Sequence, residues 1–136
     1  MQFLGSLIFT TLLLVLTPLW GLVMFALFFV PQRGQFRFAN AWARTLLWFL
    51  KVLCRLDYRV QGLENLPQGA HVAMWKHSSS WETIAQMVVL PRQVWVLKRE
   101  LMWVPFVGWG LALTRPIAVN RAAGHSAVKH VVEQGK

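Results

Sequence analysis

The chain has 136 residues, enough for one small domain, and 56% of them are hydrophobic, which is high for a soluble protein and indicates contact with a membrane. Fourteen Lys and Arg against five Asp and Glu give a net charge of +9, which is compatible with anionic lipids, phosphorylated substrates or nucleic acid. The eight tryptophans lie mostly inside apolar stretches and do not alternate with the arginines, which argues against nucleic acid. The single cysteine, Cys54, excludes an intrachain disulfide.

The first long stretch, Phe3 to Val30, contains no charged residue. As one helix it would be ~42 Å long, more than the ~30 Å hydrocarbon core of a bilayer. It is too long for the apolar part of a secretory signal, and no basic residue precedes it. We therefore expect a membrane-embedded segment. Pro18 and Gly21 leave two arrangements open, one tilted and kinked span or two shorter pieces that enter the bilayer and return.

A second apolar stretch, Phe36 to Leu56, carries a stripe of cations at intervals close to seven residues, with large apolar residues largely opposite. The cations are Arg37, Arg44, Lys51 and Arg55, and the apolar residues are Trp42, Leu46, Phe49, Leu50 and Leu53. This pattern predicts an amphipathic helix lying at the bilayer surface, and the alternative is a solvated charged face on an ordinary globular helix. The cationic flank predicts that the rest of the chain is cytoplasmic.

The composition changes at Asp57, where we place a boundary between a membrane-binding helical region, residues 1–56, and a second region, residues 57–136. In the second region His71 to Trp75 reads as a short buried strand, followed by a helix through Leu90. Residues 94–97 and 116–119 read as two further strands, and residues 126–134 as a helical tail. This alternation predicts an α/β fold.

The polar residues after the first expected strand contain the candidate chemistry. If Ser79 is the N-cap of the following helix, Glu82 is at its third position and forms a capping box, which the local sequence favours. Alternatively, the Glu82 carboxylate holds one nitrogen of His77, so that the other nitrogen accepts a proton near neutral pH. Capping and turn formation explain Ser78, Ser79 and Ser80 better than a role as nucleophile. The remaining histidines lack the spacing of metal ligands, so no metal site is predicted.

Three blocks of sequence resemble the glycerolipid acyltransferase family, and most closely its bacterial lysophosphatidic acid acyltransferases. They are Lys76-His77-Ser78-Ser79-Ser80-Trp81-Glu82-Thr83, Lys98-Arg99-Glu100-Leu101-Met102-Trp103-Val104-Pro105-Phe106-Val107-Gly108-Trp109-Gly110 and Ile117-Ala118-Val119-Asn120-Arg121. The middle block is long and specific. Family members usually have aspartate at the position of Glu82, so the carboxylate here is one methylene longer.

The resemblance implies that His77 is a general base for the sn-2 hydroxyl of lysophosphatidic acid, which attacks the thioester of acyl-CoA or acyl-carrier protein, with Glu82 fixing the imidazole tautomer. It also implies that Lys98 and Arg121 bind the substrate phosphate, that no cofactor is needed beyond the acyl donor, and that the enzyme lies on the cytoplasmic face of the bacterial inner membrane. The Glu-Gly-Thr-Arg motif of the family does not occur here, so we expect an amino-terminal fragment of a longer enzyme. The alternatives are a non-catalytic membrane anchor or interaction fragment, and a sibling enzyme acting on glycerol-3-phosphate or another lysolipid.

Overall fold

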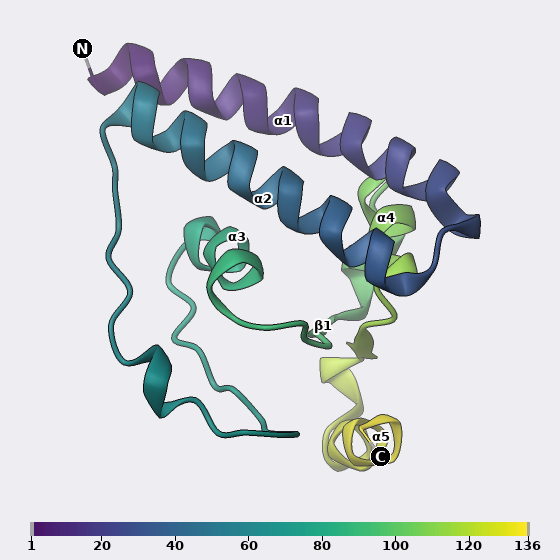
Figure 1. Ribbon diagram of the computed structural model, residues 1–136. Coiled ribbons are helices and arrows are strands. Elements are labelled where there is room, and N and C mark those ends of the chain that lie inside the picture. Colours follow the sequence, from purple (N-terminus) through teal and green to yellow (C-terminus); the bar gives the residue numbers. More distant parts are fainter. Residues whose placement is uncertain (1, 136) are drawn as a thin grey trace.

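The computed structural model describes residues 2–135, apart from the side chains of Arg121 and His125. The α-helices are α1 (Gln2–Ala26), α2 (Gln32–Cys54), α3 (Ser80–Val89), α4 (Val107–Leu113) and α5 (His125–Gln134). The short 3-10 helices are η1 (Leu27–Phe29), η2 (Leu63–Asn65), η3 (Arg99–Trp103) and η4 (Arg121–Ala123). The strands are β1 (Val96–Lys98) and β2 (Ile117–Val119). Figure 1 shows α1 and α2 as a long hairpin above α3, with α4 behind the end of the hairpin, β1 below these helices and α5 farthest from the hairpin.

Helix α1 runs without interruption past Pro18, so the first apolar stretch is one continuous helix and not two shorter pieces. Only 11% of its most apolar window is buried, unlike the core helix of a soluble protein. By length and composition the segment Gln2–Phe29 could cross a membrane. One such helix near an N-terminus is weak evidence of membrane association by itself.

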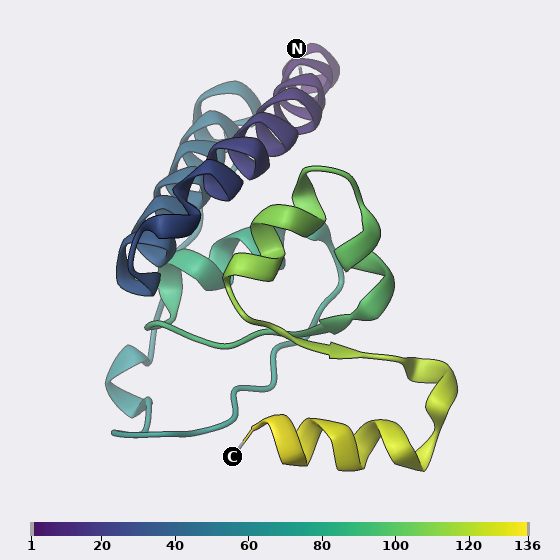
Figure 2. The same cartoon turned by 90° about the vertical axis from the view of Figure 1, so that its right-hand side faces the viewer.

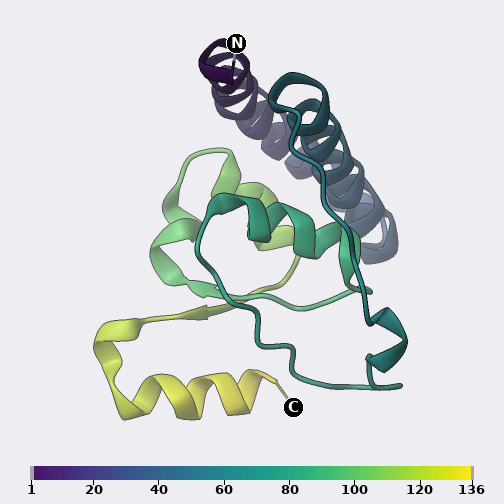
Figure 3. The same ribbon diagram turned by 90° about the vertical axis from the view of Figure 1, so that its left-hand side faces the viewer.

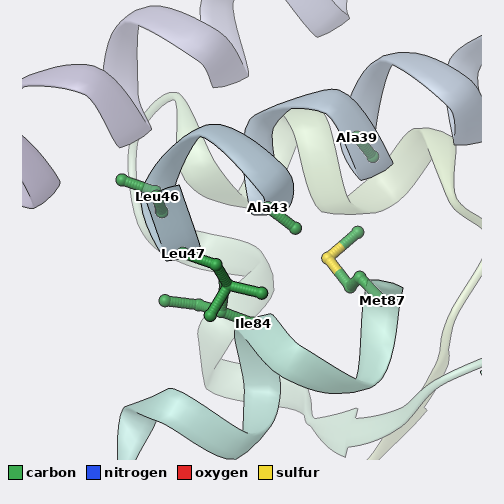
Figure 4. Close-up of a cluster of buried hydrophobic side chains, with 6 residues drawn as sticks. All are labelled: Ala39, Ala43, Leu46, Leu47, Ile84 and Met87. Carbon is green, nitrogen blue, oxygen red and sulfur yellow. The ribbon is translucent and has the colours of Figure 1, made fainter. Parts of the chain in front are cut away.

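Helix α2 is amphipathic as predicted, and its apolar face is packed against protein. Figure 4 shows four of its residues against Ile84 and Met87 of α3 in the main hydrophobic cluster; the four are Ala39, Ala43, Leu46 and Leu47. The predicted cations are exposed: Arg37, Arg44, Lys51 and Arg55. The cluster contains residues from both sides of the boundary proposed after residue 56, so α2 and α3 share one core.

Two glycines of α1 let the backbones of neighbouring elements approach closely. A Cβ at Gly5 would overlap the carbonyl oxygen of Leu53 in α2, and a Cβ at Gly21 would overlap the carbonyl oxygen of Phe106, just before α4. Gly110 of α4 faces the same place, since its Cβ would come within 3.1 Å of the Gly21 Cα. The glycines therefore hold α1 against α2 near one end and against α4 near the other.

We expect Gly21→Ala to destabilise the chain, although alanine is the better helix former by roughly 1 kcal/mol. The added methyl group would meet a backbone carbonyl that can move only with the turn before α4. Thermal unfolding of the detergent-solubilised chain, followed by circular dichroism, measures the effect. Ser6→Ala, at an exposed position of the same helix, is the matched control and should not lower the melting temperature. A Gly21→Ala variant as stable as this control would show that α4 is not held there.

The sheet is smaller than an α/β fold would suggest. Strands β1 and β2 are parallel, with Val96 opposite Ile117, Leu97 opposite Ala118 and Lys98 opposite Val119. The connection between them passes through η3 and α4, which gives one strand, helix, strand unit. The two later strands are thus confirmed in shortened form, but the described chain is mostly helical and the α/β prediction holds only in part.

The predicted strand from His71 to Trp75 is wrong. The segment is not part of a sheet, and Val72 and Met74 are 88% and 96% exposed. Apolar composition made the segment look buried, but a strand also requires a neighbour for its backbone N–H and C=O groups. Within residues 2–135 the only strands that pair are β1 and β2, and they pair with each other. The segment therefore reaches α3 as an exposed linker.

Candidate active site at the start of helix α3

The start of α3 is built by its own sequence. Ser79 has an extended backbone and is the N-cap, and its hydroxyl oxygen accepts a hydrogen bond from the Trp81 amide at 3.2 Å. Glu82 closes the capping box by accepting from the Ser79 amide at 2.6 Å and from the Ser79 hydroxyl at 2.8 Å. It also accepts from the Ser78 amide at 3.3 Å. The capping interpretation of Glu82 and Ser79 is therefore confirmed.

The same geometry places Glu82 beside His77. Nδ1 of His77 lies 3.7 Å from Oε2 of Glu82, within the range of an ion pair and longer than a hydrogen bond. The His77 side chain is 64% exposed, whereas that of Glu82 is only 13% exposed. A capped carboxylate thus lies next to an accessible imidazole, so capping and proximity to His77 coexist.

Burial by neighbouring atoms would raise the pKa of Glu82, but hydrogen bonds outweigh it and lower the pKa to about 2. They come from the Ser79 hydroxyl and from the backbone amides of Glu82, Ser79 and Ser78. Donors that favour the charged form of a carboxyl group lower its pKa. Glu82 is consequently ionised throughout the physiological pH range and presents a fixed negative charge to the imidazole.

The lowered pKa of Glu82 predicts that the stability of the fold decreases at low pH. Because the folded pKa lies below the ordinary value of 4.5, ionised Glu82 contributes to stability above about pH 4.5 and loses that contribution as the pH falls toward 2. Thermal unfolding of the chain and of Glu82→Gln should be compared between pH 5.5 and pH 2.5. We expect the advantage of the unsubstituted chain to shrink with falling pH, and a constant difference would contradict the assignment. The pKa of Asp57 is also lowered, chiefly by a hydrogen bond from Lys51, but Asp57 titrates in both proteins and so cancels in the comparison.

The two predicted phosphate ligands lie at the carboxyl ends of the two strands. Lys98 is the last residue of β1, and its Nζ lies 4.0 Å from the Glu100 carboxylate. Strand β2 ends at Val119, Asn120 follows, and Arg121 begins η4. The side chain of Arg121 lies outside the described part of the chain. Since the strands are parallel, both residues lie at the same edge of the sheet. In Figures 2 and 3 the segment entering α3 lies on that same side of the molecule.

Two aromatic contacts near these residues were missed from the sequence. The rings of Tyr58 and Trp81 meet edge to face with centroids 5.5 Å apart, and this contact ties the chain after α2 to the start of α3. The guanidinium of Arg99 lies 5.8 Å above the ring of Trp103. No local pattern indicates the first contact, because its partners are separated by a long linker. The second has the helical spacing of four residues and could have been anticipated.

Within the described part of the chain, His77, Glu82 and Lys98 belong to no metal-ligand cluster and do not line either of the two principal cavities. Among the residues that the structure describes, no group of three or more His, Cys, Asp and Glu side chains could hold a metal ion. A cavity of about 330 Å³ lies between the α1–α2 turn and the end of α4, and its lining includes Gln35 and Arg115 but not His77, Glu82 or Lys98. The candidate site is formed by the start of α3 and the ends of β1 and β2 on one side of the molecule, where the side chains of His77 and Lys98 are 64% and 51% exposed.

The structure combines a long apolar helix that could cross a membrane with a paired histidine and carboxylate and a small parallel sheet. Residues 57–136 match the acyltransferase family, and the chain belongs to that family. It is 38% identical to a 1-acyl-sn-glycerol-3-phosphate acyltransferase of Pseudomonas aeruginosa, over 98% of this chain and 53% of that protein. A protein of the same name from Saccharomyces cerevisiae is 29% identical over 63% of this chain and 29% of its own length. Another from Salmonella typhimurium is 33% identical over 66% of this chain and 36% of its own length.

The chain thus spans about half the length of the Pseudomonas relative and smaller shares of the other two. No solved structure shows significant similarity to it. The Pseudomonas match covers the helical hairpin as well as residues 57–136, so the similarity extends beyond the region matched by the family.

Proposed function

We propose that the protein containing this chain transfers an acyl group to the sn-2 hydroxyl of lysophosphatidic acid and forms phosphatidic acid for phospholipid synthesis. The observation that carries the proposal is the pairing of His77 with an ionised, capped Glu82 inside the region matched by the acyltransferase family. Three relatives that bear the name of this activity support the choice of acceptor.

In the proposed reaction His77 acts as a general base through Nε2, because its Nδ1 faces Glu82. Nε2 accepts the hydroxyl proton while the hydroxyl oxygen attacks the thioester carbonyl of the acyl donor. The imidazolium that forms is stabilised by the Glu82 carboxylate, and it returns the proton to the departing thiolate. The C–O bond of the new ester forms and the C–S bond breaks, so neither an acyl-enzyme nor a redox cofactor is required. The donor is acyl-CoA or acyl-carrier protein.

Lys98 and Arg121 are proposed to bind the substrate phosphate. Lys98 ends β1 and Arg121 follows β2 after Asn120, so both residues are at the same end of two parallel strands, as binding of one anion requires. Lysine supplies a point charge, and arginine can donate two parallel hydrogen bonds to phosphate oxygens. A phosphate fixed at this edge would hold the glycerol hydroxyl at a constant distance from the base.

The test of the acceptor is an acyl-transfer assay on the intact protein with a labelled acyl-CoA. Lysophosphatidic acid, glycerol-3-phosphate and lysophosphatidylcholine should be compared as acceptors, since the second lacks an acyl chain and the third lacks a phosphate monoester. We expect transfer chiefly to lysophosphatidic acid. Preferred transfer to glycerol-3-phosphate would establish the sibling reaction, and no transfer to any of the three would support a non-catalytic role.

We further propose that the protein lies on the cytoplasmic face of the bacterial inner membrane. The supporting features are the exposed apolar surface of α1 and the exposed cations of α2. In a vesicle flotation assay we expect the chain to bind anionic vesicles more strongly than neutral ones at low salt. At high salt that difference should shrink while binding through α1 remains. Complete release at high salt would show that α1 is not embedded.

A further inference from the structure

A second exposed apolar surface lies on the turn between η3 and α4. Four large apolar residues there are at least 40% exposed: Trp103 (70%), Val104 (41%), Phe106 (40%) and Trp109 (44%). Phe106 has φ of 62°, a left-handed conformation that non-glycine residues rarely adopt. Such strain persists where the surrounding structure over-determines it. The exposed side chains are therefore displayed by a fixed turn.

The turn is fixed to α1. The carbonyl of Phe106 packs on Gly21, and the rings of Phe25 and Trp109 are 5.6 Å apart. In Figures 2 and 3 the turn lies beside α1 on the side away from α2. Phe25 is itself 52% exposed, so the exposed apolar surface of α1 meets that of the turn at this contact. The turn and α1 thus form one continuous apolar surface.

Cations border this surface as they do in proteins that bind membrane interfaces. Lys98 ends β1 and Arg99 begins η3, which leads into the turn; both residues are exposed, and Arg99 lies over the Trp103 ring. Tryptophan beside lysine or arginine is typical of the headgroup region of a bilayer. The net charge of +9 opposes burial of the same surface against a second copy of the chain. A bilayer that contains anionic lipid is the partner that satisfies both the rings and the cations.

We propose that the turn from Trp103 to Trp109 inserts into the headgroup region of the membrane that holds α1, as a second contact beside the helical hairpin. The inference rests on the proposed membrane placement of α1. It has a consequence for the candidate site, because β1 leads directly from Lys98 into η3. Lys98 is then placed at the depth of lipid phosphates, where the phosphate of a lysolipid also lies.

The experiment places one fluorescent probe at a time on the chain in a Cys54→Ala background. Cysteine is introduced at Trp103 in the turn, at Leu14 on the exposed face of α1 and at Val128 on α5, and is labelled with an environment-sensitive dye. Leu14 and Val128 are 68% and 64% exposed, so all three sites begin from similar exposure. The proteins are mixed with phosphatidylcholine and phosphatidylglycerol vesicles with and without spin-labelled lipids. We expect blue-shifted, quenched emission at residues 14 and 103 and solvent-like emission at residue 128.

Quenching at residue 14 without quenching at residue 103 would overturn the second contact and leave the placement of α1 intact. Lack of quenching at both would overturn both proposals. A concentration-dependent shift at residue 103 that needs no vesicles would identify self-association and also overturn the inference. The probe at residue 103 removes the Trp103 ring, which could disturb the turn. A second probe at Val104→Cys keeps that ring, and we expect it to show the same blue shift and quenching.

Discussion

In the intact protein, His77→Ala should reduce acyl transfer to lysophosphatidic acid by about 10² to 10⁴-fold, the usual contribution of a general base. The imidazole lies 3.7 Å from an ionised carboxylate, yet most of its side chain is accessible. It can therefore meet a substrate hydroxyl through Nε2 while Glu82 stabilises the positive charge. Initial rates at saturating acyl donor over a range of acceptor concentrations measure the loss.

His71→Ala is the matched control. His71 is an exposed histidine of the same linker, and its Nδ1 lies 2.9 Å from the carbonyl oxygen of Gly69 instead of beside a carboxylate. This variant should retain its activity. Unchanged turnover in folded His77→Ala would remove His77 as the base. A similar loss in both variants would indicate that the linker, and not the imidazole of His77, limits the reaction.

Short-range patterns in this chain were read correctly from the sequence. The spacing of Ser79 and Glu82 is enough for a capping box, because a side chain at the third helical position reaches back to the N-cap. The capping geometry also brings Glu82 toward His77, which precedes the helix. The periodic apolar residues of α2 likewise indicated the face that packs on α3.

Contacts between segments far apart in the chain could not be predicted from the sequence. An apolar run such as residues 71–75 does not reveal whether another strand is available to bond with it, and here the segment is exposed. The contact of Gly21 with the Phe106 carbonyl joins positions 85 residues apart in the sequence. A glycine inside a long apolar helix could equally mark a bend, which was one of the alternatives at Pro18 and Gly21. Only the position of α4 shows that close packing is its role.

The second large effect is expected from Glu82→Gln. Glutamine keeps an oxygen that can accept from the Ser79 amide, so the cap survives at least in part, but the negative charge beside His77 is lost. We expect turnover to fall roughly 10-fold to 100-fold, below the loss expected for the base itself. The pH profile of kcat should change as well, because the imidazolium loses a stabilising charge.

Glu82→Asp separates charge from capping, since it keeps the charge and shortens the reach by one methylene. If Glu82 acts by orienting and charging His77, Glu82→Asp should recover more activity than Glu82→Gln at comparable melting temperature. If Glu82 is only a cap, activity should follow thermal stability in both variants, and the pH profile should not move. A Glu82→Gln enzyme with full turnover and a lowered melting temperature would leave the carboxylate with its structural role alone.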